Sequence, residues 1–323
     1  MAVVLAAENV KETLEMRKAL CATLSDLAAQ REDIVYLDAD LYGSSGMKPF
    51  AAAYPDRAFN VGIAEANLIG VACGLSATGK TPFVHSFGPF ATRRCYDQIF
   101  LSGAYAKNTI NVIGSDPGIT AAYNGGTHMP FEDIALMRSI PTAIVVEPTD
   151  TTMLKSVIRQ LADLRGVHYI RLKRKNAVSV YDEGTTFEIG KSITIREGND
   201  VTLIACGIMV AQAIRAADIL HQQGIEARVI DMFTIKPIDV QAIVEAADDT
   251  GALVTCENHN IVGGLGSAVA EVVVAHTPVV MEMVGVEDEF GEVGTEDFLR
   301  ERFRLTAEHI VEKALKAIAR RDA

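Results

Sequence analysis

A single carboxylate stands at the start of a predicted helix of small residues. The stretch from Phe59 to Leu75 reads FNVGIAEANLIGVACGL, and Glu65 falls in the first turn of that helix. The helix dipole favours a negative charge there, whereas the apolar neighbours penalise it. Such a conflict is typical of functional sites, although a helix cap or an ion pair explains the position equally simply. Small residues that let another backbone or a flat ligand approach closely stand at Gly62, Ala66, Gly70 and Gly74.

Two phenylalanines follow the next predicted strand. Phe87 and Phe90 are three residues apart, a spacing at which two rings can wall a slot for a heteroaromatic ligand. Ordinary core packing explains the same spacing. A long glycine-containing loop then carries His128, and loops at the carboxyl ends of parallel strands are where open α/β sheets bind ligands. His128 is therefore the titratable candidate of this loop, with a solvated or structural imidazole as the alternative.

The second half of the chain offers weaker signals. The run Gly263-Gly-Leu-Gly266 lacks the full G-x-G-x-x-G pattern and the acidic residue about 20 positions further on, which excludes a dinucleotide site. The preceding Glu257-Asn258-His259 brings polar groups to a predicted strand end. These groups are either structural or catalytic.

The charge balance excludes two classes of partner. Thirty basic against forty-two acidic residues leave a net charge of −12 over 323 residues, which repels phosphate backbones and anionic lipid headgroups. We therefore expect neither nucleic acid nor membrane as a partner. No apolar run approaches the roughly 20 residues that cross a bilayer, and the first residues do not read as a signal peptide. The five cysteines form no C-x-x-C pair or zinc-like spacing, which favours a reduced, cytoplasmic setting.

Short Val- and Ile-rich runs alternate with segments of helical period, the pattern of a parallel sheet with crossover helices. The sequence therefore predicts an α/β fold. The predicted strands cover 34–37, 109–113, 143–146 and 167–172 in the first part, and 201–206, 227–230, 253–256 and 279–283 in the second. The first helix is expected to begin after Asn9, with an apolar stripe that includes Val10 and Leu14.

The alternation lapses in a polar stretch between Arg174 and Gly198 and restarts with VTLIACG. We predict that the domain boundary falls there. The expected organisation is a larger domain over 1–180, a linker region over 181–198 and a smaller α/β domain over 199–323.

Several ordered motifs resemble the C-terminal half of transketolase, in particular the separate C-terminal subunit of transketolases that are split into two chains. The matching stretches cover nearly the whole sequence and are LDADLYGSSG from Leu37, FNVGIAEAN from Phe59, SFGPFATRRCYDQI from Ser86, GGTHMPFEDIALMRSIP from Gly125, VVEPTD from Val145, YIRLKR from Tyr169 and ENHNIVGGLGSAVAE from Glu257. The resemblance implies a pyrimidine-binding domain of the thiamine-diphosphate-binding fold, a parallel sheet with helices on both faces, followed by the smaller transketolase C-terminal domain.

The resemblance also implies roles for four residues. Glu65 matches the glutamate that hydrogen-bonds N1′ of the thiamine diphosphate pyrimidine and promotes its imino tautomer. Phe87 and Phe90 match the aromatic wall against that ring, and Arg93 stands where some transketolases place a third aromatic residue. His128 matches the histidine near the reacting carbons, where a donor stabilises a developing alkoxide and orients substrate hydroxyls.

Four further positions bear on the substrate. Ser44 and Arg174 fall near positions that contact the sugar phosphate in transketolases, a looser match. Ser115 stands in place of a phosphate-contacting histidine, and Asn124 stands in place of an aspartate near the donor C2 hydroxyl. Because Ser115 cannot supply the charge-assisted hydrogen bond of a cation, the usual pentose phosphate is in doubt. A sulfonated sugar, a branched-sugar phosphate or another anionic ketose derivative is compatible with these residues.

One motif of the family is missing. Thiamine-diphosphate enzymes hold the diphosphate and Mg²⁺ with a G-D-G motif followed by Asn, and this sequence contains no G-D-G. The resemblance therefore implies an N-terminal transketolase subunit that carries this motif and holds most of the diphosphate and the metal, with no metal ligand in this chain. It also implies a two-plus-two assembly in which the small-residue helix contributes to the contact.

Two other functions remain open at this stage. The β subunit of a 2-oxo-acid dehydrogenase shares the length, the glutamate and the cofactor, but it needs a lipoyl-bearing partner. A non-catalytic assembly subunit would keep the fold without the chemistry, although the joint presence of Glu65, Phe87, Phe90 and His128 argues against such decay. A 1-deoxyxylulose-5-phosphate-synthase-like activity is disfavoured, because those enzymes carry both halves in one chain.

Overall fold

Seven strands form the first sheet, in the order β10-β5-β6-β4-β3-β1-β2. The structure, a computed structural model, describes residues 2–323. All pairs in this sheet are parallel except β10 with β5. The strands of this sheet are β1 (Ile34–Asp38), β2 (Ala58–Asn60), β3 (Thr81–Phe87), β4 (Ile110–Ser115), β5 (Ile144–Val146), β6 (Val167–Leu172) and β10 (Thr234–Lys236). The central strands are buried along their whole length, as expected for a parallel sheet with both faces covered.

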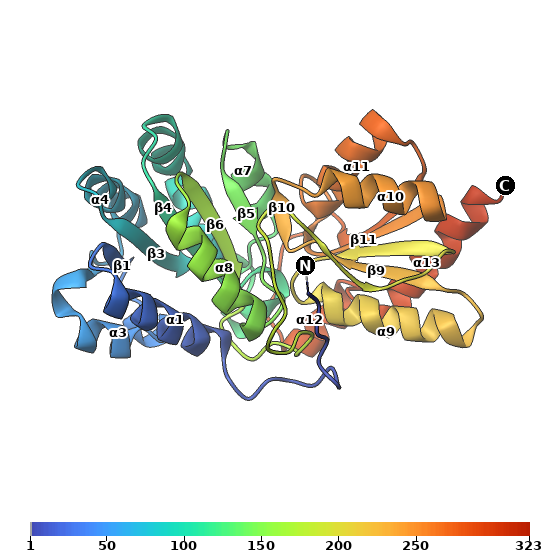
Figure 1. Ribbon diagram of the computed structural model, residues 1–323, viewed down its shortest axis with the longest axis horizontal. Helices are drawn as coiled ribbons and strands as arrows, with labels where there is room; N and C mark the ends of the chain where they lie inside the picture. The colour runs from blue at the N-terminus through green and yellow to red at the C-terminus, as the bar shows by residue number, and fades with distance from the viewer. Residues whose placement is uncertain (1) are drawn as a thin grey trace.

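Helices cover both faces of this sheet (Figure 1). The longest are α1 (Met16–Gln30), α4 (Glu65–Ala77) and α8 (Thr151–Asp163). Leu24 of α1 and Leu154 of α8 share one core with Phe83 of β3, whereas Leu68 of α4 packs in a second core with Val84. The shorter helical segments are α2 (Tyr42–Ser45), α3 (Lys48–Ala53), η1 (Pro55–Arg57), α5 (Gly88–Ala91), η2 (Arg93–Cys95), α6 (Tyr96–Gln98), η3 (Ile99–Tyr105), η4 (Gly118–Asn124), η5 (Gly126–His128) and α7 (Asp133–Ser139).

Five strands form the second sheet, in the order β12-β11-β8-β9-β7. They are β7 (Ile193–Arg196), β8 (Val201–Ala205), β9 (Ala227–Asp231), β11 (Ala252–Asn260) and β12 (Val280–Val286), and only β7 is antiparallel to its neighbour. The helices of this part are α9 (Met209–Gln222), α10 (Val240–Thr250), α11 (Leu265–His276), α12 (Glu296–Arg302) and α13 (Ala307–Arg321). Figure 1 shows α10 and α11 on one side of this sheet and α9 on the other.

Strand β10 crosses from the second part of the chain to the first sheet, and the N-terminal segment runs along the stretch between β6 and β7. The short strand β10 leaves the second part of the chain and pairs with β5 at the edge of the first sheet. The N-terminal segment runs along residues 177–186, where Ala6 N donates to Val180 O and Glu12 N donates to Ala177 O. Strand β7 lies inside the stretch for which the sequence predicts a linker.

The predicted α/β class is confirmed, and each of the eight predicted strands overlaps an observed one. The predicted start of the first helix is wrong. Helix α1 begins at Met16, and Val10 and Leu14 are 54% and 39% exposed. The apolar residues before Met16 belong instead to the extended N-terminal segment, which shares backbone hydrogen bonds with residues 175–186. Across residues 2–323, no helix has the length and apolar character that crossing a membrane requires.

Candidate functional site

Glu65 is the first residue of α4, as the sequence predicts. The chain reaches it from β2 through Gly62, whose φ of +74° is a backbone conformation that favours glycine. The Glu65 side chain is 4% exposed, and Arg94 Nη1 donates to its Oε1 at 2.8 Å. A buried carboxylate is thus held at the start of a helix, with an arginine as its partner.

Three aromatic side chains meet at the end of β3, and we call them the aromatic corner: Phe87, Phe90 and His128. The His128 ring centroid lies 5.5 Å from that of Phe87 and 5.0 Å from that of Phe90, and both contacts are edge-on. The two phenylalanine rings are 6.3 Å apart. Gly88 permits this arrangement, because a Cβ there would collide with Pro130 in the loop that carries His128. The backbone therefore brings the two predicted segments together.

Two arginines lie over the aromatic corner. The Arg94 guanidinium carbon is 3.9 Å from the Phe90 ring centroid, and that of Arg174 is 5.0 Å from the Phe87 centroid. Arg94 thus stacks on Phe90 while it donates to Glu65. A flat group with hydrogen-bond donors can therefore occupy the face of Phe90 and reach the Glu65 carboxylate at once. An aminopyrimidine ring is such a group, so these residues fit the cofactor that the sequence implies.

A partly buried ion pair between Arg174 and Asp116 lies beside Phe87 of the aromatic corner. Arg174 Nη2 lies 2.6 Å from Asp116 Oδ2, and Arg174 Nη1 donates to the backbone oxygen of Ser44 at 3.3 Å. Arg17 donates to the same oxygen at 2.9 Å. Burial raises the pKa of the Asp116 carboxyl, against the opposing effect of Arg174. The predicted residues Ser44 and Arg174 therefore lie together, at the carboxyl end of the first sheet.

The remaining two predicted residues are placed differently. Ser115 is buried at the end of β4, and its Oγ donates to Ser86 O at 3.4 Å. Asn124 is exposed at the end of η4, and in the described chain it shares no hydrogen bond with the other predicted residues. The structure thus gathers Glu65, Phe87, Phe90, His128, Arg174 and Ser44, places Ser115 on the neighbouring strand end and leaves Asn124 apart.

A second histidine lies beneath this edge. His85 of β3 is 1% exposed, and neither ring nitrogen has a hydrogen-bond partner among the described residues. Burial lowers the pKa of His85 to about 3. Its strand neighbour is Asp38, whose pKa burial raises to about 6. Both groups are polar and buried under the candidate site.

Two residues of the site, Arg94 and Asp116, were not predicted from the sequence. Arg94 lies four residues after Phe90, a spacing that places two side chains on one helical face. Asp116 directly follows the predicted site residue Ser115. Both therefore stand close to predicted residues in the sequence, but the ion pairs they make join residues 29 and 58 positions apart.

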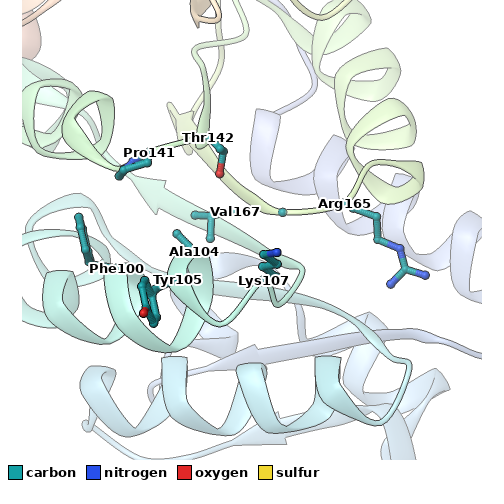
Figure 2. Close-up of a pocket in the computed structure, with 9 residues that line it drawn as sticks. Phe100, Ala104, Tyr105, Lys107, Pro141, Thr142, Arg165 and Val167 are labelled. Carbon is teal, nitrogen blue, oxygen red and sulfur yellow. The ribbon is translucent and has the colours of Figure 1, made fainter.

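A cleft of about 420 Å³ opens beside the His128 loop. It is lined from both halves of the chain, by Arg93, Gly126 and Glu132 and by Asn260, Asp288 and Phe290 among others. Arg93 pairs with Glu132 at 2.8 Å across it. Another cavity of about 420 Å³, apolar and lined by Phe100, Tyr105 and Val167, lies at the amino ends of β4 and β6 (Figure 2). None of the predicted site residues lines that second cavity.

No group of three or more His, Cys, Asp or Glu side chains within residues 2–323 is arranged to hold a metal ion. All five cysteines are buried and unpaired.

Comparison with known proteins identifies two family domains. Residues 12–179 match the transketolase pyrimidine-binding domain, and residues 190–310 match the transketolase C-terminal domain. A 6-deoxy-6-sulfo-D-fructose transketolase subunit, SqwH, from Clostridium sp. (strain MSTE9) is 50% identical over 91% of this chain and 92% of its own length. A putative transketolase C-terminal section from Methanocaldococcus jannaschii is 41% identical over 93% and 95%. One subunit of an apulose-4-phosphate transketolase from Phocaeicola vulgatus is 35% identical over 94% and 97%.

Solved structures of transketolases also resemble this chain. A split-gene transketolase described as an inactive β4 tetramer superposes with a TM-score of 0.89, at 42% identity over 95% of this chain and 99% of that one. A transketolase from Pichia stipitis has the same fold, with a TM-score of 0.81 at 21% identity, and this chain spans 48% of its length.

Proposed function

The chain belongs to the transketolase family, and we propose that it is the C-terminal subunit of a thiamine-diphosphate-dependent transketolase split into two chains. In this proposal the assembled enzyme transfers a two-carbon ketol unit from an anionic ketose to an aldose. The observation that carries the proposal is the buried carboxylate of Glu65 beside the face of Phe90, with a planar cation already between them.

Glu65, Phe87 and Phe90 would hold the pyrimidine half of the cofactor. When bound, the cofactor supplies the nucleophilic carbon that breaks and forms the carbon–carbon bond. Glu65 would exchange a proton with the ring through its carboxyl group, which is 4% exposed. The two phenylalanines would fix the plane of the ring. The chain's own part of the chemistry is therefore proton exchange and alignment.

His128 would orient the substrate. Thr127 Oγ1 lies 2.9 Å from its Nδ1, and among the described residues only that ring nitrogen is engaged in a hydrogen bond. We assign Nε2 to the substrate, where a hydrogen bond stabilises negative charge that develops on a hydroxyl oxygen. The edge-on contacts with Phe87 and Phe90 hold the ring in place.

The substrate would carry an anionic group. Arg174 supplies a guanidinium at the edge of the aromatic corner, and guanidinium groups bind phosphate and sulfonate oxygens through charge-assisted hydrogen bonds. Ser44, Ser115 and Asn124 would shape the choice among ketoses. The names of two of the relatives point to a sulfonated and a phosphorylated ketose. The greater identity to the first makes a 6-sulfonated ketose the donor to test first.

A second subunit would complete the site. This chain contains no G-D-G motif, and it covers 92% of a relative named as a transketolase subunit and 99% of a split-gene transketolase chain, so we assign the diphosphate and Mg²⁺ mainly to an N-terminal partner. We propose a two-plus-two assembly. Added Cβ atoms at Gly70 and Gly74 of α4 would meet nothing within 4 Å, so this helix face is open to a close contact. The five buried, unpaired cysteines fit the reducing cytoplasm proposed as the compartment.

The experiment reconstitutes this chain with an N-terminal transketolase subunit that carries the G-D-G motif, adds thiamine diphosphate and Mg²⁺, and measures ketol transfer from anionic ketoses. The pair carrying Glu65→Gln should lose about 100- to 10,000-fold in turnover, the usual contribution of a positioned acid–base group. Decarboxylation with transfer to a lipoyl group would identify a 2-oxo-acid dehydrogenase instead. An unchanged rate in the Glu65→Gln pair would identify a non-catalytic subunit.

A further inference from the structure

The loop that carries His128 is tied to the second half of the chain at both of its ends. It runs from Asp116 to Glu132, between β4 and α7. Strand β11 of the second sheet ends beside it, and residues 257–259 of that strand are fully buried. The loop contains a strained residue, Ala122, with φ +46° and ψ −117°. Such a conformation persists only where its surroundings impose it.

Asn258 holds the first end. Its Oδ1 accepts a hydrogen bond from Ile119 N at 2.9 Å, and its Nδ2 donates to Pro117 O at 2.9 Å. A carboxamide carries its acceptor and its donors on two separate atoms, so Asn258 can serve both partners at once. Gly118, between these two partners, has φ +50°, and a Cβ there would overlap Asn258. The glycine and the asparagine therefore form a matched pair across the two halves of the chain.

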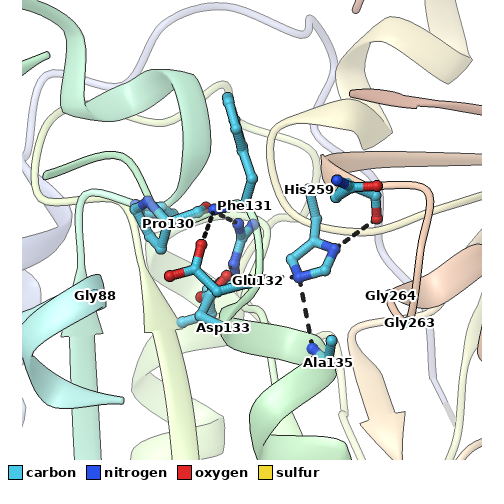
Figure 3. Close-up of polar contacts among 12 residues, drawn as sticks. Gly88, Pro130, Phe131, Glu132, Asp133, Ala135, His259, Gly263 and Gly264 are labelled. Atoms are coloured by element: carbon cyan, nitrogen blue, oxygen red, sulfur yellow. Dashed lines mark hydrogen bonds and ion pairs between the residues drawn. The ribbon is translucent and has the colours of Figure 1, made fainter. Parts of the chain in front are cut away.

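Asn260 and Arg171 hold the second end. Asn260 N donates to Phe131 O at 3.0 Å. Arg171, a fully buried cation paired with Asp133 and Glu147, donates to Asn258 O at 2.7 Å and to Pro130 O at 3.4 Å. Figure 3 shows Pro130 and Phe131 at this junction, with His259 beside the start of α7, where Ala135 N donates to its Nε2 at 3.5 Å.

We propose that Asn258 is a positioning residue for the substrate-orienting loop, through which the C-terminal domain sets the place of His128 against the aromatic corner. This inference rests on the proposed function. It assigns the C-terminal domain a part in substrate binding, although none of its side chains lies in the aromatic corner. Glu65, Phe87 and Phe90 lie on α4, β3 and α5, whereas both side-chain hydrogen bonds of Asn258 go to residues 117 and 119 of the loop. Loss of Asn258 should therefore affect the substrate and leave the cofactor in place.

The test compares Asn258→Ala with Asn111→Ala in the reconstituted pair. Asn111 is a matched control, because it is equally buried and makes two side-chain hydrogen bonds, to Pro82 O and His168 Nδ1, that do not involve the loop. We expect Asn258→Ala to lower kcat/KM for the ketose donor at least tenfold, with the Kd for thiamine diphosphate within about twofold of the unchanged pair. Asn111→Ala should leave both within about twofold, whatever it does to stability.

Two further variants keep the proposal testable if the Asn258→Ala chain does not fold. Asn258→Asp keeps the acceptor for Ile119 N but sets a second acceptor against Pro117 O, so it should lower kcat/KM for the ketose donor in the same way as Asn258→Ala. Gly118→Ala disturbs the same pair from the loop side and should reproduce the kinetic defect of Asn258→Ala. Equal kinetic losses in the Asn258 and Asn111 variants, or a loss of cofactor affinity that matches the loss in kcat/KM, would overturn the proposal.

A measurement that does not depend on enzyme turnover distinguishes a failure of this inference from a failure of the proposed function. Hydrogen exchange of the amides in residues 117–131 should be faster in Asn258→Ala than in Asn111→Ala, with the amides of α4 unchanged. If the unsubstituted pair transfers no ketol unit, the proposed function fails, and this exchange pattern still reports whether Asn258 holds the loop. Unchanged exchange in 117–131 would overturn the positioning role alone.

Discussion

Arg94 engages the buried carboxylate of Glu65 through a hydrogen bond of 2.8 Å, from a side chain that is itself 46% exposed. The carboxylate is therefore satisfied by a partner that solvent can reach and that lies on the Phe90 face where the cofactor ring is proposed to stack. In the proposed function, the pyrimidine ring would replace Arg94 as the planar partner of this carboxylate. Arg94 would keep Glu65 hydrogen-bonded in the absence of the ring.

Removal of Arg94 should measurably weaken the isolated chain. Arg94→Met deletes a charge-assisted hydrogen bond and leaves the Glu65 carboxylate without its partner, so the free energy of unfolding should fall by about 1 kcal/mol, a value reduced for the partial exposure of the arginine. Urea unfolding measures the change. Arg93→Met, which breaks a more exposed pair with Glu132, should cost less than about 0.5 kcal/mol. Equal effects of the two variants would contradict the role given to Arg94.

Truncation of the aromatic corner should weaken cofactor binding in the reconstituted pair. Phe90→Ala removes a stacking face, and an aromatic contact contributes about 0.5–1.5 kcal/mol, so the Kd for thiamine diphosphate should rise about three- to tenfold. Calorimetric titration measures it. Phe298→Ala is the control, because Phe298 is 51% exposed on α12 and lies outside the corner. If both variants bind the cofactor as the unchanged pair does, Phe90 does not stack on the ring.

Substitution of Arg174 should discriminate against charged substrates. Arg174→Gln removes the guanidinium that lies over Phe87, and a hydrogen bond to a charged group contributes about 1.5–3 kcal/mol. The KM for an anionic ketose should therefore rise about ten- to a hundredfold, whereas a neutral ketose should be little affected. Steady-state kinetics with both donors measures the difference, and Arg196→Gln on β7 is the remote control. The same rise for both donors would mean that Arg174 supports the site without reading charge.

Two buried groups should give the stability opposite dependences on pH. Burial lowers the pKa of His168 to about 4, so between pH 6.5 and 4 the unfolded chain binds the extra proton. The stability that His168 contributes is complete above pH 6.5 and is lost as the pH falls, at up to about 1.4 kcal/mol per pH unit. Burial raises the pKa of Asp231 to about 7, so between pH 3.8 and 7 the folded chain binds the extra proton and this contribution falls as the pH rises.

Denaturant unfolding across pH 4–7 tests these signs with two variants. His168→Gln should make the free energy of unfolding fall less steeply on acidification than in the unchanged chain. Asp231→Asn should make it fall more steeply, because the opposing carboxyl is gone. Slopes that move together in the two variants would show that the groups do not titrate as their burial implies.

Most of the fold could be predicted from local sequence patterns. Strand β6, at Val167–Leu172, places Val, Tyr, Ile and Leu around His168 and Arg171 between Gly166 and Lys173, and the prediction matches the observed bounds. The predicted start of the first helix was wrong because Val10 pairs through its backbone in the extended N-terminal segment. Its carbonyl oxygen accepts a hydrogen bond from Ser179 N. Strand β10 has only three residues, too short an apolar run to predict as a strand. Its strand conformation depends on pairing with β5, about 90 positions earlier in the chain.

The candidate site was predictable only in part, for a similar reason. Glu65, Phe87 and Phe90 stand next to strand or helix ends that the sequence marks, and the segments that carry them follow parallel strands of one sheet, β2 and β3, whose carboxyl ends lie at the same edge. The contact of Asn258 with Ile119 joins residues 139 positions apart, across two sheets. No local pattern encodes such a pairing, so only the tertiary structure could place Asn258 beside the loop that carries His128.

The most direct test of the proposed function is a calorimetric titration of thiamine diphosphate with Mg²⁺, first into this chain alone and then into its complex with an N-terminal subunit that carries the G-D-G motif. We expect tight binding only in the complex, because in the proposed function this chain supplies the pyrimidine half of the site and the partner supplies the diphosphate half. Tight binding to the isolated chain would contradict the shared site. Absence of binding in both states would contradict the cofactor dependence itself.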